Sequence, residues 1–312
     1  MQAGERPGGG NIAMLGPPAS GKTTFLAALS TALMQHEPSW QLVGEDPASS
    51  RSLIRLMALL DERGAFPAAT ADLGQYRWSL VGPARETGRR FGGRRRSGEV
   101  KIGLNLIDLP GMMATAAPIF EPSGQLAKTL VSTSAIVFLY DPVREYERGD
   151  TFSYADRVFA AMASEASQLD GRLPHYVAVC ITKFDEPRVL ATAERMGMLE
   201  FDPEPPRFPR VPDDLAREFF TEICRASRSD NSSLLPGLLA RAFYPDRIRF
   251  FATSAIGFYI NPRTESYDPG DFQNLVPGGM GIRIRGPVRP INVVEPLLWL
   301  SRHIASNQGL RR

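Results

Sequence analysis

The feature that most constrains the fold is a short apolar run that leads into a glycine-rich loop. The run 11–15 (NIAML) predicts a buried strand, and 23–34, rich in Ala and Leu at helical spacing, predicts a helix. The loop between them consists of Gly16, Pro17, Pro18, Ala19, Ser20, Gly21, Lys22 and Thr23, with Thr24 next in the helix. Because backbone N–H groups and a helix dipole converge in such a loop, it predicts a phosphate-binding site.

This loop fits the pattern G-x-x-x-x-G-K-[ST] in full. Its glycines let the backbone approach phosphates closely, and successive backbone N–H groups together with the helix dipole bind the negative charge. We expect Lys22 to neutralise the β and γ phosphates, as a catalytic residue, and the Thr23 hydroxyl to bind Mg²⁺. The alternative is a turn of small residues with a chance G-K-T, which the flanking strand and helix disfavour.

Further strands alternate with helices along the chain. Buried strands are predicted at 135–140, 176–182 and 248–252, and helices at 47–63, 152–169, 213–227 and 292–306, the last with Asn292 as its cap. Two runs that alternate apolar and polar residues, 76–81 and 100–107, predict a hairpin. The pattern predicts a three-layer α/β fold of the P-loop NTPase type, with a mostly parallel sheet and one antiparallel hairpin strand.

The length allows one elaborated domain or two, and we expect one. Residues 1–10 form a Gly-rich tail that we expect to be flexible, and 11–312 form a single domain with insertions at about 40–68, 186–245 and 257–290. The last insertion is rich in Gly and Pro without a clear period, and such long irregular segments are often functional.

A candidate metal-binding carboxylate follows the strand 100–107. Asp108 takes the position from which a P-loop enzyme holds Mg²⁺, and the backbone N–H of Gly111, in D-x-x-G, can reach a γ-phosphate. On its own, the motif is explained as well by a turn-forming Asp. Together with the glycine-rich loop, it favours a metal site.

Two further motifs follow the strands 176–182 and 248–252. The first consists of Thr182, Lys183, Phe184 and Asp185, and the second of Thr253, Ser254 and Ala255. A carboxylate at Asp185 can accept hydrogen bonds from N1 and N2 of guanine, whereas adenine has no such pair of donors. This motif therefore predicts selection of guanine.

Taken in order, the four motifs resemble those of the P-loop GTPase superfamily of Ras-like and translation-factor-like switches. The resemblance covers about residues 11–256 and the final helix, with Thr182 in place of the Asn of the N-K-x-D signature. It implies GTP or GDP and Mg²⁺ as ligands, a base contact from the turn at Ser254 and Ala255, and a metal-binding switch threonine, for which we choose Thr70. The ending N-V-V-E-P-L-L-W-L resembles bacterial double-GTPase-like proteins of conflict or signalling systems.

The chain departs from this pattern at Met112, which stands where Ras-like enzymes place the glutamine that orients the attacking water. We therefore expect a GTPase with slow intrinsic hydrolysis that a protein partner, effector or activator, stimulates. Two alternatives remain open. One is a P-loop ATPase or small-molecule kinase in which T-K-F-D is coincidental. The other is a non-catalytic nucleotide-binding interaction module.

Charge and cysteine content indicate which classes of partner and which cellular compartment to expect. Counts of 36 basic and 34 acidic residues give a net charge of +2, which does not favour nucleic acid. We interpret the basic loop 85–96 as a solvated hairpin tip, and the alternative is a docking surface for an acidic partner or a source of a trans-acting arginine. The start of the sequence lacks the apolar stretch typical of a signal peptide, so we do not expect export, and its apolar runs are shorter than a membrane span requires. Cys180 lies in a predicted strand and Cys224 in a predicted helix, so we expect both to be reduced, buried thiols in a cytoplasmic protein. The oligomeric state is left open.

Overall fold

The structure is a computed structural model, and it describes residues 10–67, 77–83, 99–106, 124–166, 171–279 and 281–309. Several predicted features lie outside these residues: Thr70, the loop 85–96, Asp108, Gly111, Met112 and the tail 1–9. Their predicted roles stay predictions.

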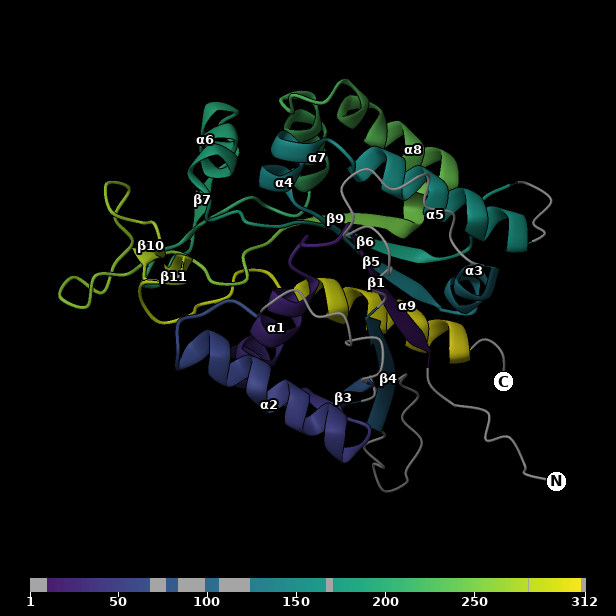
Figure 1. Ribbon diagram of the computed structural model, residues 1–312, viewed down its shortest axis with the longest axis horizontal. Helices are drawn as coiled ribbons and strands as arrows, with labels where there is room; N and C mark the ends of the chain where they lie inside the picture. The colour runs from purple at the N-terminus through teal and green to yellow at the C-terminus, as the bar shows by residue number, and fades with distance from the viewer. Residues whose placement is uncertain are drawn as a thin grey trace, which may run out of the picture.

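A seven-stranded sheet forms the centre of the molecule (Figure 1). In order across the sheet the strands are β2 (Gln41–Gly44), β3 (Trp78–Pro83), β4 (Glu99–Leu106), β1 (Asn11–Leu15), β5 (Ala135–Tyr140), β6 (Tyr176–Ile181) and β9 (Ile248–Ala252). Strand β3 is antiparallel to both of its neighbours, and the other neighbouring pairs are parallel. The predicted fold class, with a mostly parallel sheet and one antiparallel strand, is confirmed.

The central strands are apolar along their whole length because helices cover both faces of the sheet. Side chains of β1 alternate between two buried clusters, with Ile12 and Met14 on one face and Ala13 and Leu15 on the other. All six residues of β5 are buried. This burial fixes β1 in the middle of the sheet, with its carboxyl end at the glycine-rich loop.

Helices form the two outer layers (Figure 1). The cluster that contains Ile12 includes buried residues of α1 (Lys22–His36), α2 (Pro47–Asp61) and α9 (Glu295–Gly309). The cluster that contains Ala13 includes residues of α3 (Gly124–Val131), α5 (Thr151–Ala166), α7 (Ala216–Arg225) and α8 (Leu235–Ala242). The domain therefore has the three layers that the alternating pattern predicts.

The last helix begins later than predicted. It starts at Glu295, and Asn292 is not its cap: the Asn292 side chain donates from Nδ2 to the carbonyl oxygen of Ala252 at 3.2 Å. Asn292 has a φ of 52°, in the left-handed region that Asn tolerates better than most residues. The prediction of the cap was wrong because an Asn before an apolar run is typical of turns as well as of helix starts. Here its side chain bonds to the end of β9 instead of to the first turn of α9.

Several short elements were not predicted. They are β2 at the edge of the sheet, the helices α3, α4 (Pro142–Arg148), α6 (Pro187–Arg195) and α8, the hairpins β7 (Glu200–Phe201) with β8 (Pro209–Arg210) and β10 (Leu275–Gly278) with β11 (Gly281–Ile284), and the 3₁₀ turns 230–234 and 245–247. Cys180 and Cys224 are buried free thiols, as predicted. In the part of the chain that the structure describes, every helix is too short or too polar to cross a membrane.

Candidate functional site

The glycine-rich loop connects β1 to α1 and wraps tightly. Its backbone takes positive φ values at Ala19 (62°) and Gly21 (89°), and the Ser20 N–H donates to the Pro17 carbonyl oxygen at 3.1 Å. Gly16 is required for packing, because a Cβ there would lie 2.9 Å from the carbonyl oxygen of Leu139 in β5. The predicted strand, loop and helix are formed, with the loop at the N-terminus of α1.

The side chain of Lys22 lies against the loop rather than in solvent. Its ammonium group donates to the carbonyl oxygens of Gly16 at 2.8 Å and Pro17 at 3.1 Å, and the residue is buried. The buried Ser20 hydroxyl has no hydrogen-bond partner among the residues that the structure describes. Because an unpaired buried hydroxyl is costly, its position suits a polar ligand in the loop. Thr23 and Thr24 lie in the first turn of α1, half-buried.

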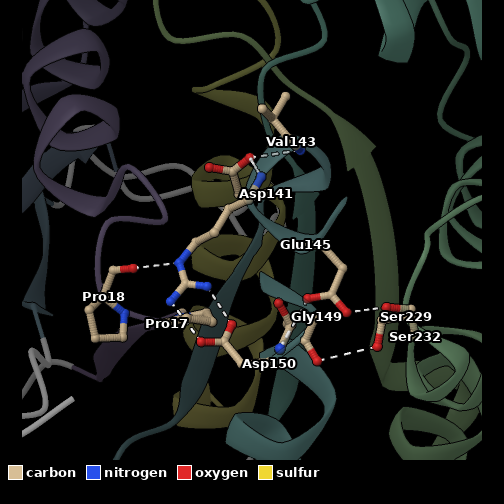
Figure 2. A network of polar contacts seen from close by, with 12 residues as sticks. Pro17, Pro18, Asp141, Val143, Glu145, Gly149, Asp150, Ser229 and Ser232 are labelled. Atoms are coloured by element: carbon tan, nitrogen blue, oxygen red, sulfur yellow. Dashed lines mark hydrogen bonds and ion pairs between the residues drawn. The ribbon is translucent and has the colours of Figure 1, made fainter. Parts of the chain in front are cut away.

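Two distant side chains contact the outer side of this loop. Arg144 of α4 donates from Nε to the carbonyl oxygen of Pro18 at 2.7 Å (Figure 2). The Gly16 N–H donates to the hydroxyl of Tyr154 in α5 at 3.2 Å. Both side chains belong to the connection between β5 and the body of α5, so this connection helps to fix the shape of the loop.

The carboxylate of Asp185 lies at a second corner of the sheet, after β6. It is buried, and its Oδ1 accepts a hydrogen bond from the Ser254 hydroxyl at 2.5 Å. Burial raises the pKa of Asp185 to about 6, and the hydrogen bond from Ser254 partly opposes this rise. The corner therefore holds a carboxyl group that is destabilised as an anion until a ligand supplies donors.

The turn after β9 positions Ser254 for this contact. Ser254 pairs with Ile291 through both of their backbone groups, and its side-chain oxygen accepts the Gly257 N–H at 2.8 Å. Gly257 has a φ of 67°, and a Cβ there would lie 1.9 Å from the carbonyl oxygen of Arg289. Ala255, the other residue predicted in this turn, is half-buried.

The residues between β6 and Asp185 anchor the corner to its neighbours. Thr182 donates from its N–H at 2.8 Å and its hydroxyl at 3.1 Å to the carbonyl oxygen of Tyr140 at the end of β5. Lys183, with a φ of 57°, places its ammonium group 2.9 Å from the buried carboxylate of Asp141. The Lys183 side chain is 41% exposed, so its stem is accessible to a ligand.

Asp141 connects the two corners. Its Oδ1 accepts the N–H groups of Val143 and Arg144, both at 3.0 Å, and so caps α4, while its Oδ2 faces Lys183. The carboxyl ends of β1, β6 and β9 lie at one edge of the sheet because these strands run in the same direction. The structure thus brings the glycine-rich loop together with the motifs at Asp185 and Ser254.

Sequence reasoning missed Asp141 and Tyr154, and could not place Arg144. Asp141 had a usable signal, since an Asp-Pro pair after a buried strand is typical of a helix start with Pro at its first position. No local signal identifies Arg144 or Tyr154, because their partners are 126 and 138 residues away in sequence.

The site was also tested for a metal. Among the described residues, no three carboxylate, imidazole or thiol side chains gather to form a metal cluster. Mg²⁺ in nucleotide sites commonly takes only one or two protein oxygens and completes its shell with phosphates and water. The half-buried Thr23 beside the unpaired Ser20 hydroxyl fits such a site.

Comparisons with known proteins found distant matches to solved structures. No family model and no curated protein matches the sequence. A nucleolar GTP-binding protein 1 from Plasmodium falciparum is 12% identical, with a TM-score of 0.36, over 98% of this chain and 91% of that one. A chain of the SRb-GTP/SRX complex of the signal recognition particle receptor from Chaetomium thermophilum is 13% identical, with a TM-score of 0.36. The match covers 82% of this chain and 94% of that one. The GTP-bound Ski7 GTPase-like domain from S. cerevisiae is 13% identical, with a TM-score of 0.38. The match covers 95% of this chain and 50% of that one.

Since every TM-score is below 0.5, the function proposed below rests on the geometry of the site. The chain has the fold of a P-loop NTPase, as its own strand order and glycine-rich loop show.

Proposed function

We propose that this protein is a Mg²⁺-dependent GTP-binding switch that hydrolyses GTP slowly and is stimulated by a protein partner. One observation carries the proposal. The buried carboxylate of Asp185 lies at the same edge of the sheet as the glycine-rich loop and is oriented by Ser254. In this arrangement, Asp185 can bind the base of a nucleotide and the glycine-rich loop can bind its phosphates.

The chemistry of Asp185 favours guanine over adenine. A buried carboxylate is stabilised as an anion when donors satisfy it, and burial raises the pKa of Asp185 to about 6, so further donors from a ligand would favour the charged form. Guanine presents N1–H and the N2 amino group side by side, whereas adenine presents no such pair. Lys183 adds an accessible stem that can lie across the base.

The glycine-rich loop supplies the groups for the phosphates. The loop lies at the N-terminus of α1, where N–H groups and the helix dipole favour an anion, and Lys22 is already held at the loop through Gly16 and Pro17. In this proposal, Thr23 binds Mg²⁺ with Asp108 and Thr70, and the Gly111 N–H contacts the γ-phosphate. When bound, Mg²⁺ neutralises charge on the β and γ phosphates.

Slow hydrolysis follows from Met112. A thioether does not position water by donating a hydrogen bond, and positioning of the attacking water is a main part of catalysis in this class of reaction. A partner that supplies an arginine or a polar group is expected to accelerate turnover by ~10³ to 10⁵. The free, buried thiols of Cys180 and Cys224 support a cytoplasmic location.

Competition binding tests the proposal. Fluorescent GDP bound to the purified protein is displaced with unlabelled GTP, GDP, ATP and ADP, and the nucleotide retained after purification is identified by chromatography. Guanine nucleotides should compete at least ~100-fold better than adenine nucleotides, which corresponds to about 3 kcal/mol of discrimination. Preference for ATP would favour the ATPase or kinase alternative.

Single-turnover hydrolysis tests the switch. We expect GTP to be converted to GDP at well below about 1 s⁻¹ by the isolated protein, with an increase in Met112→Gln. Complete absence of turnover, with tight GTP binding, would favour the non-catalytic binding module. Rapid turnover by the protein alone would contradict dependence on a partner.

A further inference from the structure

Two side chains of the connection 141–154 between β5 and α5, Arg144 and Tyr154, contact the glycine-rich loop. The connection consists of α4, a turn at Gly149 with a φ of 63°, and the first turn of α5. None of its residues belongs to the four motifs that identify the nucleotide site. Its function is therefore not given by the resemblance.

The main contact comes from Arg144, whose side chain is only 7% exposed. Its Nε donates to the Pro18 carbonyl oxygen, and its two terminal nitrogens pair with both carboxylate oxygens of Asp150, with Nη2 at 2.9 Å from Oδ2. A buried guanidinium is stable only when paired, and the planar fork fixes its direction. Arg144 is therefore held with one donor aimed at the loop.

The connection is itself firmly anchored. The Glu145 carboxylate accepts hydrogen bonds from the Thr151 N–H, at 3.0 Å, and from the Ser232 hydroxyl (Figure 2). The Ser229 hydroxyl donates to the carbonyl oxygen of Gly149 at 3.3 Å. These bonds tie α4 to the 3₁₀ turn 230–234, which is far away in the sequence. Arg144 thus contacts the loop from a rigid support, as a positioning group requires.

The contact at Pro18 affects where the loop's backbone groups point. A carbonyl that bonds to Arg144 is not directed at the ligand, whose phosphates repel carbonyl oxygens. Tyr154 adds a second external contact at Gly16. The two contacts lie on opposite ends of the segment Gly16 to Pro18.

We propose that Arg144, oriented by Asp150, is a positioning residue that shapes the glycine-rich loop for the β-phosphate of the nucleotide. The inference rests on the proposed function only in that the loop binds a nucleoside diphosphate or triphosphate. It assigns Arg144 a role in ligand affinity rather than direct contact with the reacting phosphate.

The test measures affinities for GDP and GMP, because GMP lacks the β-phosphate. Arg144→Met keeps the length of the side chain without donors, and we expect it to weaken GDP binding about tenfold and to change GMP binding less than about twofold. Arg144→Lys, which retains one charged donor, should recover part of the loss. Arg148→Met is the matched control, since Arg148 is exposed on the same helix and should leave both affinities unchanged.

Asp150→Asn provides a second route if Arg144→Met does not fold. It leaves Arg144 in place but weakens its orientation, and it should reduce affinity for GDP more than for GMP. An equal loss for GDP and GMP in these variants, or unchanged GDP affinity in a folded Arg144→Met, would overturn the proposal. If the parent binds ADP instead of GDP, the proposed function fails, and the ADP and AMP pair tests Arg144 in the same way.

Discussion

The phosphate corner and the base corner of this site are built differently. In the proposed phosphate corner, we expect backbone groups of the loop 16–21 to provide most of the recognition, and Arg144 and Tyr154 contact that backbone. In the proposed base corner, we expect one buried side chain, Asp185, to provide the recognition, and Ser254 donates a hydrogen bond to it. Recognition by backbone depends on loop shape, whereas recognition by a buried carboxylate depends on its charge.

This difference gives each corner its own sensitivity. Backbone N–H groups do not titrate, so the phosphate corner itself should be insensitive to pH near neutrality. The base corner contains a carboxyl group whose pKa burial has raised to about 6. Substitutions and pH should therefore separate phosphate affinity from base selection.

The largest effect is expected for Lys22→Ala. It removes the ammonium group that faces the phosphates and also its bonds to Gly16 and Pro17, so GTP and GDP affinity should fall by at least about 100-fold. Competition with fluorescent GDP measures the loss, and thermal unfolding checks the fold. Because the base corner is untouched, any residual binding should keep its preference for guanine. Parent-like affinity would exclude the loop from nucleotide binding.

Asp185→Asn should act on the base corner alone. An amide cannot accept both guanine donors, so GDP affinity should fall by about 10- to 100-fold. The same amide can donate to O2 of xanthine, and discrimination against xanthine nucleotides should relax. A competition series with guanine, xanthine and adenine diphosphates measures both changes. If base preference is the same as in the parent, Asp185 does not contact the base.

Acid should weaken guanine binding through the same residue. Guanine requires the ionised carboxylate, and the free protein protonates Asp185 as pH falls through about 6, so GDP affinity should fall by up to about tenfold per pH unit below this value. Titration of GDP affinity between pH 5 and 8 measures the profile. Asp185→Asn is the control, since it retains only the titration of the phosphates. Identical profiles in parent and variant would contradict the prediction.

Ser254→Ala should give the smallest change. The hydrogen bond from Ser254 lowers the pKa of Asp185, so its removal should move the midpoint of the pH profile to higher pH. At pH 8 the carboxylate remains ionised, and the loss of GDP affinity should be only a few-fold, on the order of 1 kcal/mol. A midpoint that stays in place, in a folded variant, would show that Ser254 does not tune this carboxyl group.

Much of the fold was predictable because its signals are local. The apolar run 11–15, the loop 16–21 and the helix after it each follow from neighbouring residues, and all three are formed. The buried strands β5, β6 and β9 were likewise predicted from continuous apolar runs. Edge strand β2 and the hairpin β10–β11 were not, because four-residue strands carry too few side chains to show a period.

The sequence alone identified the residues that we propose to contact phosphate and base, since the glycine-rich loop and T-K-F-D follow buried strands that end at one edge of a parallel sheet. Only the tertiary structure decided what holds those residues in place. Asp141 lies between the two corners, and Arg144 and Tyr154 reach the loop across more than a hundred residues of chain. The physical reason is that hydrophobic period and glycine positions act over a few residues, whereas a contact between distant side chains depends on how helices pack on the sheet.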